Sequence, residues 1–254
     1  MKIIGVIPAR LSSTRLKQKV LADILGKPMI QRVYEQATKA QLVGRVVVAT
    51  DHNAIADVVR AFGGAVMMTP ATLQSGSDRV AYVAEQIPDA EIVVNVQGDE
   101  PLISPIMIDE TIRPLADDRS IEVGTPVRII SSTEDIINPG TVKVVIDQAG
   151  FAIYFSRSPI PHLRDVPDVK LWHTKSVYYK HIGLYVFRRS ALMNFTRWSE
   201  SELERAEKLE QLRFLIHGIR IKTVITTFDS IPIDTAEDAE MVREIMHRAA
   251  SVNL

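Results

Sequence analysis

Short apolar runs of strand length recur along the chain, and in its first half they alternate with amphipathic helical stretches. The runs predict strands at residues 2–8, 45–50, 65–69, 91–97, 121–130, 142–147, 150–155, 183–188 and 222–227. Residues 46–49 and 92–96 show no alternation of apolar and polar positions, which is typical of strands buried on both faces of a parallel sheet. Helices are predicted between the early strands, at 28–40, 53–62, 77–86 and 106–115. This order predicts an α/β fold with a mainly parallel sheet and right-handed crossovers.

The second half of the chain has a different pattern, with strands between 121 and 155 that follow one another closely. Turn sequences at 138–140 and 148–150 favour antiparallel hairpins there. Residues 159–178 have no clear periodicity, so a flap, an oligomer contact and a plain surface loop remain open. Two further helices are predicted, at 201–216 and 234–250. We therefore expect one domain over residues 1–254, with an inserted antiparallel lobe around 120–190.

Composition narrows the class of protein. The 254 residues carry a formal net charge of −1, so no overall field favours nucleic acid or an anionic membrane. The absence of cysteine excludes disulfides, zinc–thiolate sites and thiol nucleophiles. No apolar run approaches a membrane span, and the first residues lack the apolar core of a signal peptide. We expect a cytoplasmic protein that neither enters a membrane nor binds nucleic acid, in which any anion site is a local cluster.

A basic loop, residues 8–19, follows the first predicted strand. It holds Arg10, Arg15, Lys17 and Lys19, together with serine and threonine hydroxyls, and no acid. Ligands of open α/β sheets bind at the carboxyl ends of the strands, and such a loop suits a polyphosphate. It is neither a Walker A loop nor a Gly-x-Gly-x-x-Gly loop. A plain basic surface loop is the alternative, which the position after a buried strand weakens.

Acidic residues follow another buried strand, in the sequence Asn-Val-Gln-Gly-Asp-Glu-Pro at 95–101. Asp99 at a strand end is suited to Mg²⁺, which would bridge it to a polyphosphate; a turn with solvated acids is the alternative. Asp234 precedes the last predicted helix, where a helix cap by Asp234 or Thr235, closed by Glu237 or Asp238, is favoured over a functional role.

Three further stretches have ordinary structural explanations of at least equal weight. Gln-Ser-Gly-Ser-Asp-Arg at 74–79 enters a helix, so its free backbone donors suit a ligand or simple capping. His181 is isolated, and a structural histidine is the commoner case. The charges of Glu-Gln-Leu-Arg at 210–213 are typical of a solvated helix face.

Taken together, these stretches resemble the 3-deoxy-manno-octulosonate cytidylyltransferase (CMP-Kdo synthetase) family, from residue 3 to about residue 245. The matching stretches, in chain order, are Pro8-Ala9-Arg10, Ser13-x-Arg15 with Lys19, Thr50-Asp51-His52, Gln74-Ser75-Gly76, Val96 to Pro101, Tyr154 to Arg157, Lys180 to Gly183, Leu209 to Arg213 and Asp234-Thr235. The resemblance implies a Rossmann-like nucleotidyltransferase fold of the nucleotide-diphospho-sugar transferase type. It also implies a Mg²⁺-dependent homodimer that converts CTP and 3-deoxy-D-manno-octulosonate (Kdo) to CMP-Kdo and pyrophosphate for lipopolysaccharide synthesis.

The resemblance also assigns roles to individual residues. The phosphates of CTP would be held by Arg10, Arg15 and Lys19 beside Ala9, and the cytidine site would be lined by Ser75, Gly76 and Gln97. Asp99 and Asp234 would bind Mg²⁺; with Arg15 and Lys19 they form the catalytic set. The acid sugar would contact Arg157, His181, Glu210 and Gln211, and the segment around 159–185 would contribute to the dimer.

Two departures from the family pattern are visible. Leu16-Lys17-Gln18-Lys19 stands where the commoner pattern is Leu-Pro-Gly-Lys, and Leu73 replaces a frequent His. Related cytidylyltransferases for 8-amino-Kdo or an acylneuraminate remain alternatives, as does a nucleotide-binding regulatory module without catalysis. A nicotinamide dehydrogenase is disfavoured because no Gly-x-Gly-x-x-Gly is present.

Overall fold

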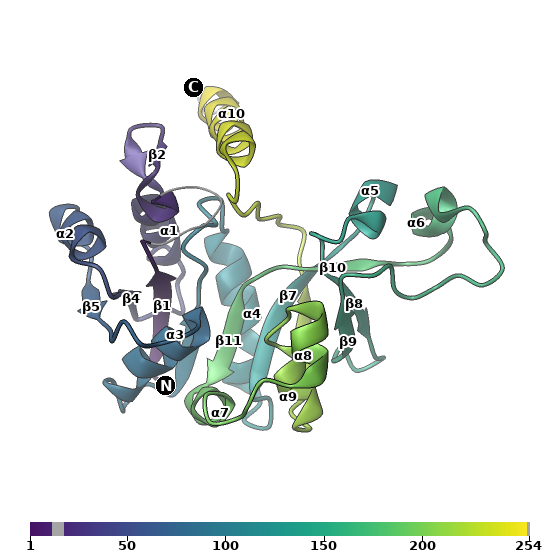
Figure 1. The fold of residues 1–254 in the computed structure, drawn as a ribbon, viewed down its shortest axis with the longest axis horizontal. Coiled ribbons are helices and arrows are strands. Elements are labelled where there is room, and N and C mark those ends of the chain that lie inside the picture. The colour runs from purple at the N-terminus through teal and green to yellow at the C-terminus, as the bar shows by residue number, and fades with distance from the viewer. Residues whose placement is uncertain (12–17, 253–254) are drawn as a thin grey trace. The chain divides into compact units, whose positions relative to one another are not determined.

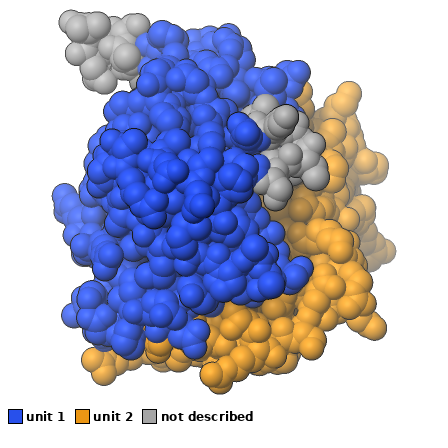
Figure 2. Space-filling model, turned by 60° about the vertical axis from the view of Figure 1, so that its left-hand side comes forward, with its two compact units in different colours: residues 1–109, 229–254 blue, residues 110–228 orange. Residues whose placement is uncertain are grey.

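The computed structural model describes residues 1–11 and 18–252 and divides the chain into two compact units. The first unit combines Met1–Asp109 with the C-terminal segment that begins at Asp229, and the second is Glu110–Phe228 (Figure 2). Helix α4 (Pro105–Asp117) contains the boundary between them. No helix among the described residues is long and apolar enough to cross a membrane.

The first unit is built on parallel strands, as the sequence predicts. In spatial order they are β5 (Val66–Met68), β4 (Arg45–Thr50), β1 (Ile3–Ala9) and β6 (Ile92–Asn95). The first three are labelled in Figure 1. Every residue of β1 and β6 is buried, which explains the continuous apolar runs. The carboxyl ends of β1 and β6 therefore meet at one edge of the sheet.

Helices α1 (Met29–Ala37), α2 (Asn53–Ala61) and α3 (Gly76–Glu85) connect these strands. The inner face of α1 carries the buried side chains of Ile30, Val33 and Ala37. Helix α3 begins with a capping box, in which the Ser75 side chain and the Asp78 side chain each accept from the other's backbone N–H.

The C-terminal segment returns to the first unit and places Asp234 there. The backbone N–H of Ile233 donates to the carbonyl of Asp99 at 2.9 Å. Helix α10 (Ala236–Val252) then packs through Ala239 and Val242 on Ile24 and Met29. Ile24 belongs to the small hairpin of β2 (Asp23–Ile24) and β3 (Lys27–Pro28), which follows the 3-10 turn η1 (Lys19–Leu21). Two sequence segments far apart are thereby joined by one apolar cluster.

The second unit carries the predicted antiparallel strands. Strand β7 (Val123–Ile129) pairs antiparallel with β10 (Tyr179–His181) and β11 (Tyr185–Arg188), and β10 continues to β8 (Lys143–Ile146) and β9 (Ala152–Ser156). Strand β12 (Ile221–Ile225) pairs with β7 in parallel. The expected turn at 148–150 closes the β8–β9 hairpin, where Gly150 has a φ of +75°.

Short helices fill the remaining parts of this unit. They are α5 (Thr133–Ile137), η2 (Val169–Leu171), α6 (Trp172–Lys175) and α7 (Arg189–Phe195). Within the segment 159–178, for which the sequence gives no clear pattern, Trp172 and Tyr178 stack at 6.1 Å and join a buried cluster with Ile130 and Ile136. The segment is therefore anchored to neighbouring parts of the second unit by a shared apolar cluster.

The prediction of one continuous helix at 201–216 is wrong. Helix α8 (Glu202–Glu207) ends at Lys208, whose φ of +53° is left-handed, and α9 (Leu212–Ile216) starts four residues later. Such a conformation at the end of a helix stops its hydrogen-bond ladder, although glycine is the usual residue there. A buried ion pair between Glu204 and Arg213 joins α8 to α9 and offsets the interruption. The break leaves the last carbonyls of α8 available to other donors.

Candidate active site

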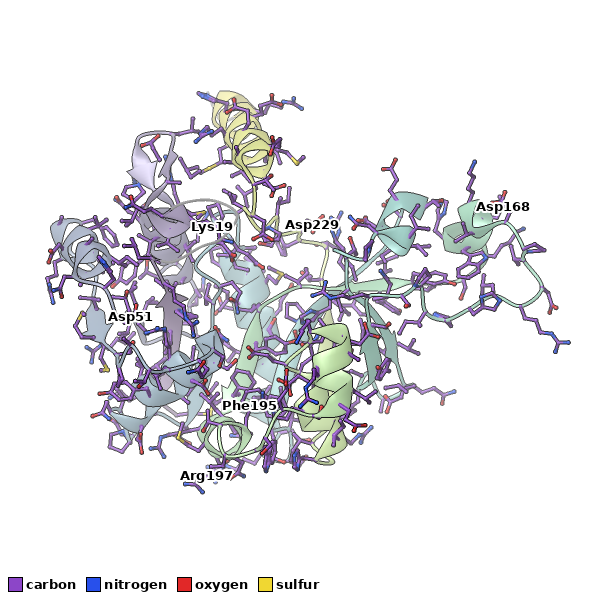
Figure 3. The ribbon with its side chains drawn as sticks, in the orientation of Figure 1. Lys19, Asp51, Asp168, Phe195, Arg197 and Asp229 are labelled. Atoms are coloured by element: carbon purple, nitrogen blue, oxygen red, sulfur yellow. The ribbon has the colours of Figure 1, made fainter. Side chains whose placement is uncertain are left out.

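Lys19 lies between the two aspartates that the sequence singles out. Its Nζ is 2.5 Å from Asp99 Oδ2 and 2.8 Å from Asp234 Oδ1, and only 13% of its side chain is exposed. Lys19 itself is labelled in Figure 3. Burial opposes the charge, but the two carboxylates outweigh burial and raise the pKa of Lys19 above its usual value. The structure therefore brings three predicted residues, from three distant segments, around one positive charge.

The helix cap expected of Asp234 or Thr235 is confirmed, and Thr235 is the residue that forms it. Thr235 Oγ1 accepts from the N–H of Asp238, and Asp238 Oδ2 accepts from the N–H groups of Thr235 and Asp234. Thr235 and Asp238, which are among the residues that the sequence predicts for the cap, thus form the capping box. The Asp234 carboxylate is left to meet Lys19.

Asp99 and Asp234 also fit a Mg²⁺ site. Both carboxylates already contact one common cation, the Lys19 ammonium, so their oxygens converge on a position suited to positive charge. Within the described part of the chain, no three His, Cys, Asp or Glu side chains are grouped to hold a metal by themselves. This donor set suits Mg²⁺, which is commonly bound by one or two carboxylates together with substrate phosphates and water.

A close backbone contact fixes the path from β6 to Asp99. A Cβ on Gly98 would lie 2.9 Å from the carbonyl oxygen of Pro8, at the end of β1. A side chain at this position would force the two strand ends apart, so the loop needs glycine. Gln97, the residue before it, is half-buried, and its Nε2 is 3.5 Å from Asn95 Oδ1.

The nucleotide candidates in the loops of the first unit are partly joined. Arg10, directly after Ala9, donates from Nη2 to the carbonyl of Leu73 at 3.1 Å and so links the basic loop to the segment that holds Ser75 and Gly76. Both the hydroxyl and the backbone N–H of Ser75 take part in the capping box of α3. Arg15, expected to hold phosphate, lies outside the described residues.

Gln18 explains how the loop departs from the family pattern. It has φ 54° and ψ 36°, a left-handed conformation that glycine adopts without strain. The chain therefore keeps the left-handed turn that Gly would favour, directly before Lys19. Because Gln18 has a side chain, its backbone is strained in this conformation.

Glu100 is a neighbour that the sequence reading did not distinguish from Asp99. Its side chain is buried, and its Oε2 has no hydrogen-bond partner. Burial, with the nearby Asp99 charge, raises the pKa of Glu100 to about 7. Asp99 is partly exposed, whereas Glu100 is buried. The sequence, in which the two acids are adjacent, carries no signal that distinguishes them.

The sugar candidates all lie in the second unit. His181 Nε2 is 3.0 Å from Thr125 Oγ1, whose own hydroxyl proton is directed to the carbonyl of Leu184 at 2.8 Å. Nε2 must then be the protonated nitrogen, which leaves Nδ1 as an acceptor. Burial lowers the pKa of His181 to about 3, so the ring is neutral near neutral pH.

Tyr185 is a further candidate that the sequence reading missed. Its ring lies 5.2 Å from that of His181, and its buried hydroxyl has no partner. Burial, followed by the charge of Glu210, raises the pKa of Tyr185. Gln211 is also buried, with Nε2 unpartnered, whereas Glu210 is exposed. Unpaired buried polar groups are rare in folded proteins and suit a polyhydroxyl ligand.

Arg157, at the end of β9, has a different environment. Its guanidinium donates to the carbonyls of Glu207 and Pro139 at 2.7 and 2.9 Å. Across the described residues, no carboxylate lies within 4.0 Å of its nitrogens. The guanidinium is therefore held in place by neutral carbonyls and not by an ion pair.

Comparisons with known proteins decide the family. A sequence profile of cytidylyltransferases matches residues 4–221. The 3-deoxy-manno-octulosonate cytidylyltransferase of Geobacter metallireducens is 53% identical over 252 residues, which are 98% of this chain and 99% of the relative. The chain belongs to the 3-deoxy-manno-octulosonate cytidylyltransferase family.

Other relatives agree. The protein of the same name from Geotalea uraniireducens is 52% identical, over 96% of this chain and 98% of the relative. A solved structure of CMP:2-keto-3-deoxy-manno-octonic acid synthetase complexed with CTP matches with a TM-score of 0.91 and 42% identity, over 98% of this chain and all of that one. The 4-diphosphocytidyl-2C-methyl-D-erythritol synthase from Anaerococcus prevotii, at 14% identity and a TM-score of 0.62, shares the fold alone. The nucleotidyltransferase fold expected from the sequence is confirmed.

Proposed function

We propose that this chain transfers the cytidylyl group of CTP to the anomeric hydroxyl of Kdo, which gives CMP-Kdo and pyrophosphate for lipopolysaccharide synthesis. The observation that carries the proposal is the convergence of Lys19, Asp99 and Asp234 at the carboxyl edge of the parallel sheet. The similarity to a synthetase bound to CTP supports the nucleotide, and the names of the close relatives support the sugar.

The reaction joins two anions that repel each other, so positioning and charge compensation are the main tasks of the protein. The sugar hydroxyl attacks the α-phosphorus of CTP in line and gives up its proton to solvent, the bond from phosphorus to the bridging oxygen breaks, and pyrophosphate leaves. Lys19 compensates charge that develops on the leaving pyrophosphate, and Arg10 binds phosphate from the end of β1. Mg²⁺ held by Asp99 and Asp234 would supply further neutralisation of the phosphate oxygens.

The residues proposed to contact the acid sugar belong to the second unit. The uncompensated Arg157 guanidinium suits the sugar carboxylate, because charge-assisted hydrogen bonds of this type are strong and directional. Neutral His181 offers its Nδ1 as an acceptor, and Gln211 offers its unpartnered Nε2 to a hydroxyl. No protein nucleophile is needed, so we expect no covalent intermediate.

The protein is further proposed to act in the cytoplasm, where CTP is supplied, and as a homodimer. Large apolar side chains are exposed on the second unit at Ile129, Leu171 and Val177, near the segment expected to contribute to the dimer. Sedimentation of the purified protein would test this part: a monomer at all concentrations would contradict it.

Pyrophosphate release is the test of the reaction. The full chain is assayed with each of four nucleoside triphosphates against Kdo, 8-amino-Kdo and an acylneuraminate, with Mg²⁺ or with EDTA. We expect release only with CTP, Kdo and Mg²⁺. Preference for one of the other sugars would correct the substrate, and no release with any acid sugar would refute the function.

A further inference from the structure

Arg157 is fixed through both its backbone and its side chain. Its backbone N–H donates to Glu207 Oε2 at 2.9 Å, and its carbonyl accepts from Lys143 Nζ at 2.6 Å. Its Nε donates to the carbonyl of Glu207 at 2.7 Å. The peptide groups on the two sides of Arg157 are therefore held by separate charged side chains.

Lys143 is one of these, and its burial needs an explanation. The side chain, on β8 opposite Ser156 of β9, is fully buried, which is costly for an ammonium group. Besides Arg157, its Nζ donates to the carbonyls of Asn138 and Thr141 at 2.8 and 2.6 Å. Three acceptors use all three N–H groups of an ammonium, so Lys143 ties the turn at 138–141 to the end of β9.

Glu207 holds the other side. Its Oε1 accepts from Ser156 Oγ at 2.6 Å, while Oε2 takes the N–H of Arg157. Glu207 is the last residue of α8, so the left-handed Lys208 that ends the helix also frees the carbonyl that receives Arg157 Nε. The interruption of the expected 201–216 helix thus serves to anchor Arg157.

The acceptors around the guanidinium are all neutral carbonyls. Those of Pro139 and Glu207 orient it, yet they leave its charge available to an anion. A long arginine side chain that is ordered before binding loses less rotamer freedom when the ligand arrives. Lys143 and Glu207 provide this order through their bonds to the backbone and to Nε of Arg157.

We propose that Lys143 and Glu207 are positioning residues that hold the Arg157 guanidinium in one orientation, as the receptor for the carboxylate of the acid sugar. The role of Arg157 in this inference rests on the proposed function. The orientation of Arg157 by Lys143 and Glu207 does not rest on the proposed function. The positioning and the binding of the sugar can therefore be tested separately.

The first experiment compares Lys143→Met and Ser156→Ala with wild type by steady-state kinetics. Ser156→Ala is the milder variant, because it removes a hydroxyl donor to Glu207 and leaves Lys143 in place. We expect KM for Kdo to rise about tenfold in each, while KM for CTP and kcat stay within about twofold. Thr223→Val is the matched control: it also loses a buried hydroxyl bond to a carbonyl of the second unit, that of Gly150, and should change none of these constants.

The second experiment asks whether the effect passes through Arg157. In an Arg157→Met background, Ser156→Ala should raise KM for Kdo no further, because the group it orients is gone. The proposal would be overturned if Ser156→Ala raised KM for Kdo in the Arg157→Met background by the same factor as in wild type. It would also be overturned if KM for Kdo were unchanged in both single variants, or if KM changed equally for Kdo and CTP. So would an unchanged KM for Kdo in Arg157→Met itself.

A third measurement does not need turnover. Hydrogen exchange at Arg157 Nε–H, followed by NMR, should be slow in wild type and at least about tenfold faster in Ser156→Ala, since the bond to the Glu207 carbonyl loosens. Unchanged exchange would overturn the positioning role whatever the substrate. Faster exchange in a protein that releases no pyrophosphate with any acid sugar would instead refute the proposed function and the receptor role, and leave the holding of Arg157 standing.

Discussion

Replacing Lys19 by methionine should destabilise the metal-free protein and create a site for Mg²⁺ that does not depend on nucleotide. The Nζ of Lys19 makes two charge-assisted contacts, at 2.5 and 2.8 Å, to carboxylates that are 26% and 33% exposed. Each such bond is worth about 1.5–3 kcal/mol when buried. Partial exposure and the burial cost of the ammonium reduce their sum, while the repulsion left between Asp99 and Asp234 adds to the loss. We expect a decrease of about 2 kcal/mol in the free energy of unfolding.

The assay is urea unfolding at about pH 7.5, with EDTA or with about 10 mM Mg²⁺ and no nucleotide. In wild type the ammonium competes with the metal, so Mg²⁺ alone should stabilise little. In Lys19→Met the ion should restore much of the loss, because it takes the position between the two carboxylates.

Lys2→Met is the matched control, since the contact of Lys2 with Asp89 is equally short, at 2.5 Å, but both side chains are well exposed. It should change neither the stability nor the response to Mg²⁺ appreciably. Equal stability of wild type and Lys19→Met in EDTA, or an equal effect of Mg²⁺ on both, would refute the reasoning.

Three other predictions concern single residues. Asp99→Asn should abolish pyrophosphate release while the unfolding transition stays cooperative; near wild-type rates with Mg²⁺ would remove Asp99 from the metal site. The pKa of His181 in the folded state, about 3, lies below its value in the unfolded state. The contribution of His181 to the free energy of unfolding is therefore complete above about pH 6.5 and is lost as the pH falls. Wild type should therefore lose about 2 kcal/mol more than His181→Gln between about pH 7 and pH 5 in urea unfolding, and parallel losses would contradict the buried neutral ring. Gln18→Gly should be no less stable than wild type, because it relieves a left-handed residue, whereas Gln18→Val should lose about 1 kcal/mol or more; thermal unfolding of both decides this.

Much of the fold follows from the sequence because the first unit repeats one pattern. Its strands are buried on both faces, so their apolar runs are continuous, and its helices carry caps that can be read locally, such as Ser75 with Asp78. The failure at 201–216 has the opposite cause. A left-handed Lys208 carries no sequence signal of the kind that glycine gives, and the pair of Glu204 with Arg213 that offsets it exists only in the folded chain.

The candidate site divides in the same way. The sequence by itself determined the residue types and the positions of the strand ends. These were sufficient to predict the basic loop and Asp99 as parts of the site, and to indicate the family. Only the tertiary structure decided between the two explanations of Asp234, because it shows that Thr235 caps α10 while the Asp234 carboxylate contacts Lys19. Residues 215 positions apart in the chain meet there, and no local pattern encodes such a contact. Lys143 is a second example, because the sequence shows only a charged residue in a predicted strand. The three carbonyls that accept from its Nζ come together only in the folded chain.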